Sequence, residues 1–139
     1  MKNLLLLALT LLLAACSGRE PAPLAPDAPA EDVPNIIGEY ALNGVDFYDQ
    51  EYGGRLSIQA GDAPGQYKLI WIVTGYVQQG VGALTGNQLT VEWKTLQGPL
   101  PDLHGTATYT ITVNGELYGT RHVEGYEQAE IETAYPNPQ

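Results

Sequence analysis

The sequence from residue 66 to residue 95 reads QYKLIWIVTGYVQQGVGALTGNQLTVEWKT, and its large apolar residues recur at every second position. A period of two is typical of β-strands that bury one face. Thr74-Gly75 and Gly86-Asn87 interrupt the pattern at the spacing of tight hairpin turns. The stretch therefore predicts three antiparallel strands joined by two short turns.

The two turns also predict the register of these strands. A two-residue loop in the first turn places Trp71 opposite Gln78, and the same loop in the second places Gly80 opposite Trp93. Both turns direct the same side of the central strand inward. This register also explains the glycines at positions 80 and 82, because the absence of a side chain on Gly80 and Gly82 makes room beside large neighbouring side chains.

The alternation continues on both sides of this stretch and gives eight segments separated by turn signals. Neighbouring segments are joined by short connections, so they should pair as hairpins, and an eight-strand meander exposes its edges unless it closes. We therefore predict an all-β fold, an eight-stranded antiparallel up-and-down β-barrel, with a sandwich as the alternative closure. The predicted strands are 38–47, 54–60, 66–73, 76–85, 88–95, 105–112, 116–122 and 126–133.

In two later turns, a three-residue loop is expected rather than a two-residue loop. At Asn114-Gly115, a three-residue loop with Gly115 in the left-handed region keeps Ile111 and Leu117 both inward, whereas a two-residue turn would not. We expect the three-residue loop, because burial specifies register more strongly than turn statistics do.

The last hairpin is predicted to turn through a three-residue loop, Val123-Glu124-Gly125. This loop pairs Arg121 with Glu127 and Leu117 with Ile131. Ile131 would then face the core.

Alternate loops of a meander share one end, so the loops at 48–53, 74–75, 96–104 and 123–125 should surround a common mouth. The inward residues nearest this mouth are predicted to be Trp71, Gln78, Trp93, Arg121 and Glu127. An apolar far end and a polar, tryptophan-bearing near end are typical of a ligand-binding barrel. In that interpretation both tryptophans stack on a small, partly apolar ligand, Gln78 and Arg121 orient it, and Glu127 holds Arg121. The alternative is a barrel plugged by its own side chains, with Arg121 and Glu127 as an ion pair at the rim.

The N-terminus predicts export. Lys2 precedes an apolar run from residue 4 to residue 13, which is shorter than the roughly 20 residues that cross a bilayer. The sequence Leu13-Ala14-Ala15-Cys16 resembles the lipobox of bacterial lipoproteins. The resemblance implies a signal peptide over 1–15, lipidation of Cys16 and a membrane anchor. Ser17 after the cysteine implies the outer membrane, since Gram-negative lipoproteins use Asp there for inner-membrane retention.

The segment that follows is rich in Pro and Ala, with a proline at positions 21, 23, 26, 29 and 34. Such a composition favours an extended, disordered spacer. We therefore predict a lipidated cysteine and linker over 16–35 and a β-barrel domain over 36–139.

The formal net charge is −10, which argues against a nucleic-acid partner. His104 and His122 are the only histidines; they are expected at the surface without metal-ligand spacing. Asp46, Asp49 and Glu51 indicate an acidic surface loop. The sequence thus predicts no catalytic residues, no metal and no cofactor. Besides a small-molecule ligand, it leaves open a protein partner for the 96–104 loop, as an adhesin or inhibitor, and a purely structural envelope role.

Two family resemblances accompany the strand pattern. Gly38-x-Tyr40 resembles the Gly-x-Trp opening of avidin and lipocalin barrels, which implies a ligand-binding barrel, although no biotin-site pattern is present. A weaker resemblance is to small exported bacterial domains labelled fibronectin-binding. The motifs that carry it are Gly80-x-Gly82-x-Leu84, Leu89-x-Val91-x-Trp93 and Gly115-x-Leu117-x-Gly119.

Overall fold

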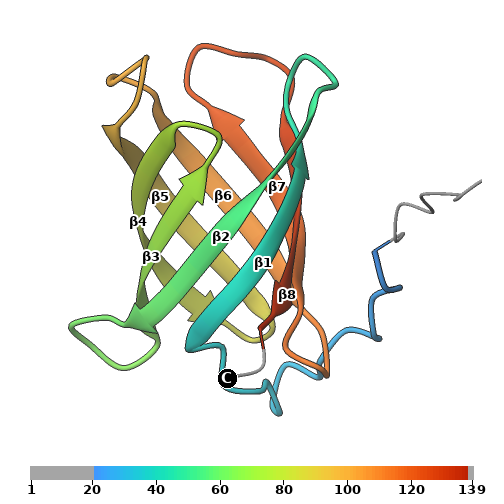
Figure 1. The fold of residues 1–139 in the computed structure, drawn as a ribbon. Coiled ribbons are helices and arrows are strands. Elements are labelled where there is room, and N and C mark those ends of the chain that lie inside the picture. Colours follow the sequence, from blue (N-terminus) through green and yellow to red (C-terminus); the bar gives the residue numbers. More distant parts are fainter. Residues whose placement is uncertain (1–20, 138–139) are drawn as a thin grey trace, which may run out of the picture.

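The computed structural model describes residues 21–137, and the eight strands within them close into a single barrel (Figure 1). Each strand pairs antiparallel with the next, and β1 pairs with β8. The predicted up-and-down barrel is therefore confirmed, and the sandwich alternative is wrong. The strands are β1 (Gly38–Val45), β2 (Glu51–Ala60), β3 (Gln66–Val73), β4 (Tyr76–Thr85), β5 (Gln88–Gln97), β6 (His104–Ile111), β7 (Leu117–Val123) and β8 (Glu130–Pro136).

The predicted register of β3, β4 and β5 is confirmed. Trp71 pairs with Gln78, and Gly80 pairs with Trp93. Gly80 does make room: a Cβ there would lie 2.9 Å from Cζ3 of Trp71 and 2.6 Å from Cγ1 of Val91. A methyl group at this position would thus displace core side chains.

The turn between β6 and β7 also follows the prediction. Gly115 has a φ of 78°, and Ile111 pairs with Leu117. Both of these side chains are fully buried. The demand for burial on both strands decides the loop.

The predicted register of the last hairpin is wrong by three residues. Arg121 pairs with Glu130 rather than with Glu127, and Leu117 pairs with Ala134 rather than with Ile131. The connection between β7 and β8 is correspondingly longer, spanning residues 124–129.

A shift by an odd number of residues turns the opposite face of a strand inward. Ile131, predicted in the core, is 59% exposed, and Glu132 is fully buried instead. With Ile131 facing the core, its neighbours Glu130 and Glu132 would lie on the outer face, but they point into the barrel instead. The physical reason is the buried charge of Arg121. Leaving this charge without a carboxylate on the neighbouring strand costs more free energy than exposing one isoleucine.

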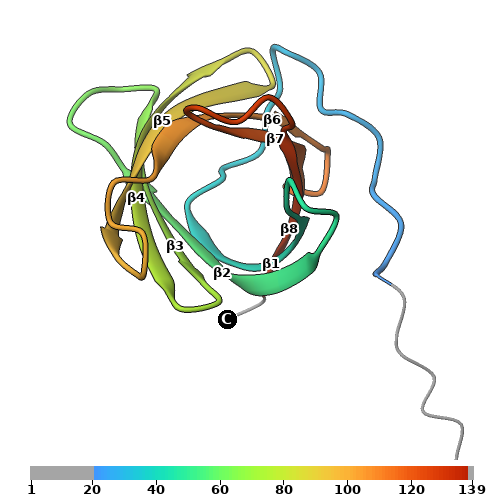
Figure 2. The same ribbon diagram turned by 90° about the horizontal axis from the view of Figure 1, so that it is seen from above.

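One end of the barrel is closed by the residues that precede β1, here called the strap (22–36). Its backbone forms an antiparallel bridge with the β6–β7 turn, in which Ala28 N–H donates to the Ile111 carbonyl and Val113 N–H donates to the Pro26 carbonyl, both at 2.9 Å. Ala28 is 2% exposed and Ile36 is fully buried. Figure 2 shows the chain passing across this end of the barrel.

The strap corrects the expected extent of the spacer. The predicted linker runs to residue 35, but residues 25–35 are held against the barrel by backbone hydrogen bonds and buried apolar side chains. The predicted signal peptide, Cys16 and Ser17 lie outside the described residues. No helix within residues 21–137 has the length and apolar character to cross a membrane.

Candidate functional site

The side chain of Arg121 lies inside the barrel between the two tryptophans. Its Cζ is 4.2 Å from the ring centroid of Trp93 and 5.0 Å from that of Trp71. Only 2% of the residue is exposed. A guanidinium between two indole faces makes cation–π contacts that are strong when water is excluded.

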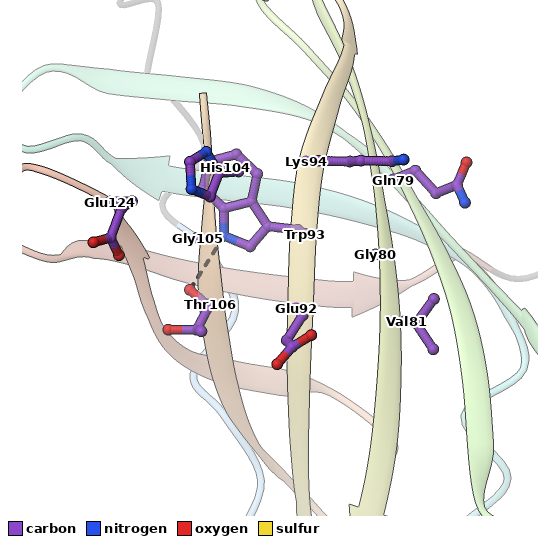
Figure 3. A pocket seen from close by; sticks show the side chains of 10 residues that line it. All are labelled: Gln79, Gly80, Val81, Glu92, Trp93, Lys94, His104, Gly105, Thr106 and Glu124. Atoms are coloured by element: carbon purple, nitrogen blue, oxygen red, sulfur yellow. Dashed lines mark hydrogen bonds between the residues drawn. The ribbon is translucent and has the colours of Figure 1, made fainter. Parts of the chain in front are cut away.

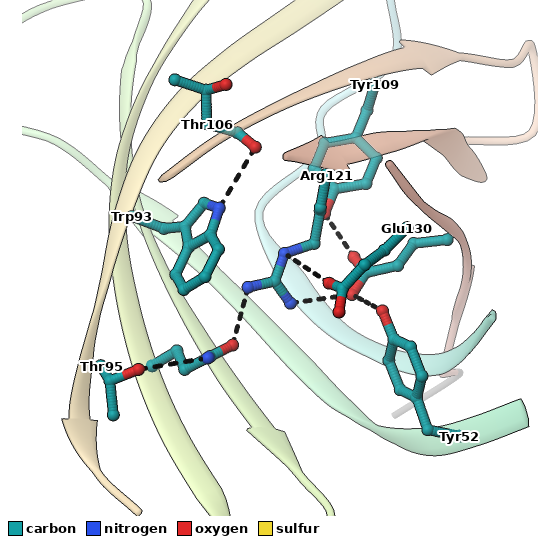
Figure 4. A network of polar contacts seen from close by, with 9 residues as sticks. Tyr52, Trp93, Thr95, Thr106, Tyr109, Arg121 and Glu130 are labelled. Carbon is teal, nitrogen blue, oxygen red and sulfur yellow. Dashed lines mark hydrogen bonds and ion pairs between the residues drawn. The ribbon is translucent and has the colours of Figure 1, made fainter. Parts of the chain in front are cut away.

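The charge of Arg121 is met by Glu132, a fully buried residue of β8. Arg121 Nη1 lies 3.0 Å from Glu132 Oε1. The hydroxyls of Tyr52 and Tyr109 donate to the two oxygens of the same carboxylate, each at 2.5 Å. Figure 4 shows Arg121, Tyr52 and Tyr109 directed toward one network of polar contacts.

The electrostatics keep Arg121, Tyr52 and Tyr109 protonated. Burial, reinforced by the charge of Glu132, raises the pKa of both Tyr52 and Tyr109 well above the ordinary value, so each hydroxyl keeps its proton. Burial lowers the pKa of Arg121, but the charge and hydrogen bond of Glu132, together with the neighbouring Tyr109 and Tyr52, more than offset it, and the net shift is upward. Arg121 therefore stays a cation.

Neighbouring polar groups complete the layer. Arg121 Nη2 donates to Gln78 Oε1 at 2.7 Å, and Gln78 in turn donates to the Thr95 hydroxyl at 3.3 Å. The indole N–H of Trp93 donates to a backbone carbonyl of β6 at 3.2 Å. These side chains fill the barrel at this depth, as the plugged alternative expects.

Above this layer, a cavity of about 370 Å³ opens at the mouth. It lies among the β1–β2 and β5–β6 loops and the mouth ends of the strands. Its apolar and aromatic lining consists of Phe47, Tyr48, Tyr52, Val73, Tyr76, Trp93, Leu100, Leu103 and Val123. Its polar lining consists of Asp46, Gln50, Glu51, Thr74, Gln78, Arg121 and Glu130. The mouth is thus hollow although the barrel below it is filled.

The structure brings together four of the five predicted ligand-site residues. Gln78, Trp93 and Arg121 line the cavity, while Trp71 lies beneath them, fully buried and outside the lining. Glu127 is not part of the site, because it is an exposed residue of the β7–β8 connection. Its predicted task of holding Arg121 belongs to Glu132.

Sequence reasoning missed two carboxylates of the site, Glu130 and Glu132, and two tyrosines, Tyr52 and Tyr109. A signal for the carboxylates was available. An inward arginine needs an acid on a paired strand, and the alternating pair Glu130 and Glu132 could supply one as well as Glu127 could. For the tyrosines, which alternate like other core residues, the sequence offers no such signal.

Glu130 differs from Glu132 in being incompletely paired. Its Oε2 lies 3.9 Å from Arg121 Nε, too far for a hydrogen bond, and that buried Nε–H has no acceptor among the described residues. The Glu130 side chain is 13% exposed. Burial raises its pKa, Arg121 lowers it, and the charges of Glu132 and Asp46 raise it further, with a net upward shift.

A second hollow, of about 530 Å³, is a groove on the wall over β4, β5 and β6 (Figure 3). His104 lies there at the start of β6, where the sequence placed it in a loop, and it is exposed, as is His122. Exposed side chains such as Val81, Glu92 and Lys94 form much of its lining. Within residues 21–137, no three His, Cys, Asp or Glu side chains are grouped to hold a metal ion.

Neither a protein-family model nor a curated protein matches this chain. Two solved structures resemble its fold, each with a TM-score of 0.58. One is a redesigned β-barrel, mFAP1, bound to DFHBI, at 10% identity over 71% of this chain and 91% of that one. The other is EF1p2_mFAP2b bound to DFHBI, at 15% identity over 71% of this chain and 90% of that one. At these identities the likeness shows the fold alone, a small closed antiparallel β-barrel.

Proposed function

We propose that the protein is a lipid-anchored envelope protein whose barrel binds a small, partly apolar ligand in the mouth cavity. The observation that carries the proposal is the cavity of about 370 Å³, open at one end of a barrel whose other end is closed by the strap. A concave, mostly apolar site with a few polar groups is typical of small-molecule recognition. The two similar barrels, both bound to DFHBI, support a small-molecule ligand for a barrel of this fold.

The ligand would lie on the Arg121 layer rather than within it. Because Arg121 occupies the space between Trp71 and Trp93, these indoles are not free to stack on a ligand from both sides. Tyr76, Phe47 and the exposed part of Trp93 would make the apolar contacts. The Arg121 layer would serve as a rigid floor, which favours affinity because little has to be ordered on binding.

Native mass spectrometry tests for a bound molecule. The chain from Ser17 onward, which retains the strap, would be exported to the periplasm and purified without detergent. We expect a reproducible mass excess that disappears on denaturation. Leu103→Trp, which fills the cavity, should abolish the excess, whereas Ile72→Trp on the outer wall should not. An excess that survives in Leu103→Trp would exclude the mouth as the site.

The anchor is a separate part of the proposal, supported by the resemblance of Leu13-Ala14-Ala15-Cys16 to the lipobox. With Cys16 lipidated, the protein would be held at the outer membrane, because several acyl chains on one residue give durable anchoring. Cys16→Ser should move the protein out of the membrane fraction and abolish labelling by radioactive palmitate. Membrane association that persists in this variant would overturn the anchor without affecting the cavity.

A further inference from the structure

The mouth cavity carries a strong excess of negative charge. Three carboxylates line it, those of Asp46, Glu51 and Glu130, against one cation, Arg121. The charge of Arg121 is already neutralised by its ion pair with Glu132, which lies directly beneath it. The surface that a ligand meets is therefore acidic.

The loops around the mouth extend this field. Residues 46–50, 74–75, 98–103 and 124–129 contain five acidic side chains and no lysine or arginine. The five are Asp46, Asp49, Asp102, Glu124 and Glu127. A concave site lined by one sign of charge attracts ligands of the other sign and repels those of its own.

Aromatic rings surround the same space. Phe47, Tyr48, Tyr52, Tyr76 and Trp93 all line the cavity. Aromatic faces attract cations through the ring quadrupole, and cages of such rings recognise quaternary ammonium groups. Carboxylates and aromatic rings in one cavity thus favour the same kind of ligand.

A second, independent observation locates the polar end of the ligand. The buried Nε–H of Arg121, a residue only 2% exposed, has no hydrogen-bond acceptor among residues 21–137. Glu130 Oε2 lies 3.9 Å from this Nε, and within the described part of the chain Glu130 makes only this loose ion pair. Both residues line the cavity. The floor therefore offers one unused donor and one carboxylate with spare acceptor capacity at the same point.

We infer that the mouth cavity selects an organic cation, an amine or quaternary ammonium group carried on an apolar body, with Glu130 as its counter-ion. The inference rests on the proposed function and narrows its ligand class. The cationic head lies against Glu130 among the aromatic rings, and the apolar body contacts Leu100 and Leu103. A hydroxyl next to the cationic group would also satisfy the Arg121 Nε–H.

The ionised side chain of Glu130 does not stabilise the folded protein. Its pKa is raised in the folded protein, so at neutral pH the ionised form is less favourable there than in the unfolded chain. Glu130→Gln should therefore leave the unfolding temperature unchanged or higher while weakening cation binding. A merely structural carboxylate would show the opposite stability effect.

Isothermal titration of the same detergent-free chain from Ser17 onward tests charge selectivity with three probes that share a benzyl group: benzyltrimethylammonium, benzyl alcohol and phenylacetate. We expect the cation to bind at least about tenfold more tightly than the alcohol, a difference of about 1.4 kcal/mol, and phenylacetate not to bind. Glu130→Gln should weaken cation binding about tenfold. The matched control is Glu92→Gln, an exposed acid on the outer wall, which should leave binding unchanged.

The groups that face Glu130 are Arg121 on β7, Glu132 on its own strand, Asp46 in the β1–β2 loop and Tyr52 on β2. Arg121 stays charged, so protonation of Glu130 governs the loss of cation affinity at low pH. Cation affinity should fall as the pH drops through the raised pKa of Glu130, and this fall should be smaller in Glu130→Gln.

Three results would overturn the inference. If benzyl alcohol binds as tightly as the cation, or phenylacetate binds better than either, charge selectivity is refuted but the cavity remains the ligand site. If no probe binds at millimolar concentration and no mass excess is found in the native protein, both the inference and the proposed function fail.

Discussion

Replacing Arg121 by alanine should destabilise the barrel severely. The substitution breaks an ion pair of 3.0 Å with Glu132, which is fully buried. It also removes the cation that lies 4.2 Å and 5.0 Å from two indole rings, and it leaves Gln78 Oε1 without its donor. If Arg121 only oriented a ligand, as the sequence predicts, its replacement would leave the fold nearly unchanged. Its burial corrects that expectation.

The magnitude follows from the charge that remains. Removing one partner of a buried pair leaves the other uncompensated and costs about 3–5 kcal/mol. The lost cation–π contacts and hydrogen bond belong to the same network, so their contributions are not added to this figure. With a urea m-value near 2 kcal/mol per M, the midpoint should fall by roughly 2 M.

The assay is urea unfolding followed by tryptophan fluorescence. Trp71 and Trp93 are the only tryptophans, and both pack against Arg121, so the signal reports on this layer. The control is Arg55→Ala, which removes an exposed arginine from β2 and should change stability by less than about 0.5 kcal/mol.

A double variant separates charge from packing. In Arg121→Met with Glu132→Gln, no buried charge remains from the pair, so much of the lost stability should return. If Arg121→Ala lowers the free energy of unfolding by less than about 1 kcal/mol, the reasoning is refuted, because a buried, unpaired carboxylate should destabilise the fold by more than this.

Three further predictions follow from the fold. Gly80→Ala should cost about 1–3 kcal/mol in urea unfolding, because the new methyl group overlaps the core; a neutral result would contradict the close approach. Leu117→Ala should cost about 2–5 kcal/mol and Ile131→Ala less than about 0.5 kcal/mol, and equal losses would argue for the sequence-derived register of β8. Ala28→Asp should release the strap and abolish hydrogen-exchange protection of the Val113 amide, whose donor bond to the strap is 2.9 Å; an amide that stays protected would show that Ala28 does not hold the strap.

The central three strands were predictable because two independent constraints agreed. The turns at 74–75 and 86–87 allow only short loops, and both direct the same face of β4 inward. Burial of Trp71 and Trp93 on that face then followed from the period of two. Gln78 was placed inside by the same argument, and Arg121 by its alternation with the inward Leu117 on β7.

The last hairpin shows where this reasoning stops. Gly125 suggested a short loop, and Ile131 suggested the inward face, so local signals agreed on a wrong register. The deciding term is long-range: Arg121 is buried between indole rings contributed by β3 and β5 and requires a carboxylate from β8. Sequence periodicity contains no information about which charges meet across a closed barrel.

The strap failed to be predicted for a different reason. A segment of this Pro and Ala content cannot form a core of its own, as its composition indicates. It is ordered by groups that the barrel supplies, namely the free backbone positions of the β6–β7 turn and the apolar space around Ile36. Composition describes a segment alone, whereas ordering here depends on a neighbouring surface.

The two inward carboxylates of β8 differ in their depth along the barrel axis and in how completely they are paired. Glu132 lies deeper, fully buried, and receives hydrogen bonds from Arg121, Tyr52 and Tyr109, so its charge is fully compensated. Glu130 lies one pleat nearer the mouth, where the same arginine approaches it only to 3.9 Å. A buried acid without adequate partners costs stability, and in the proposed function the ligand supplies the missing partner of Glu130. The interior of an eight-stranded barrel is barely wide enough for side chains. In the proposed function, the filled layer is therefore a rigid floor, and recognition falls to the acidic, aromatic mouth above it.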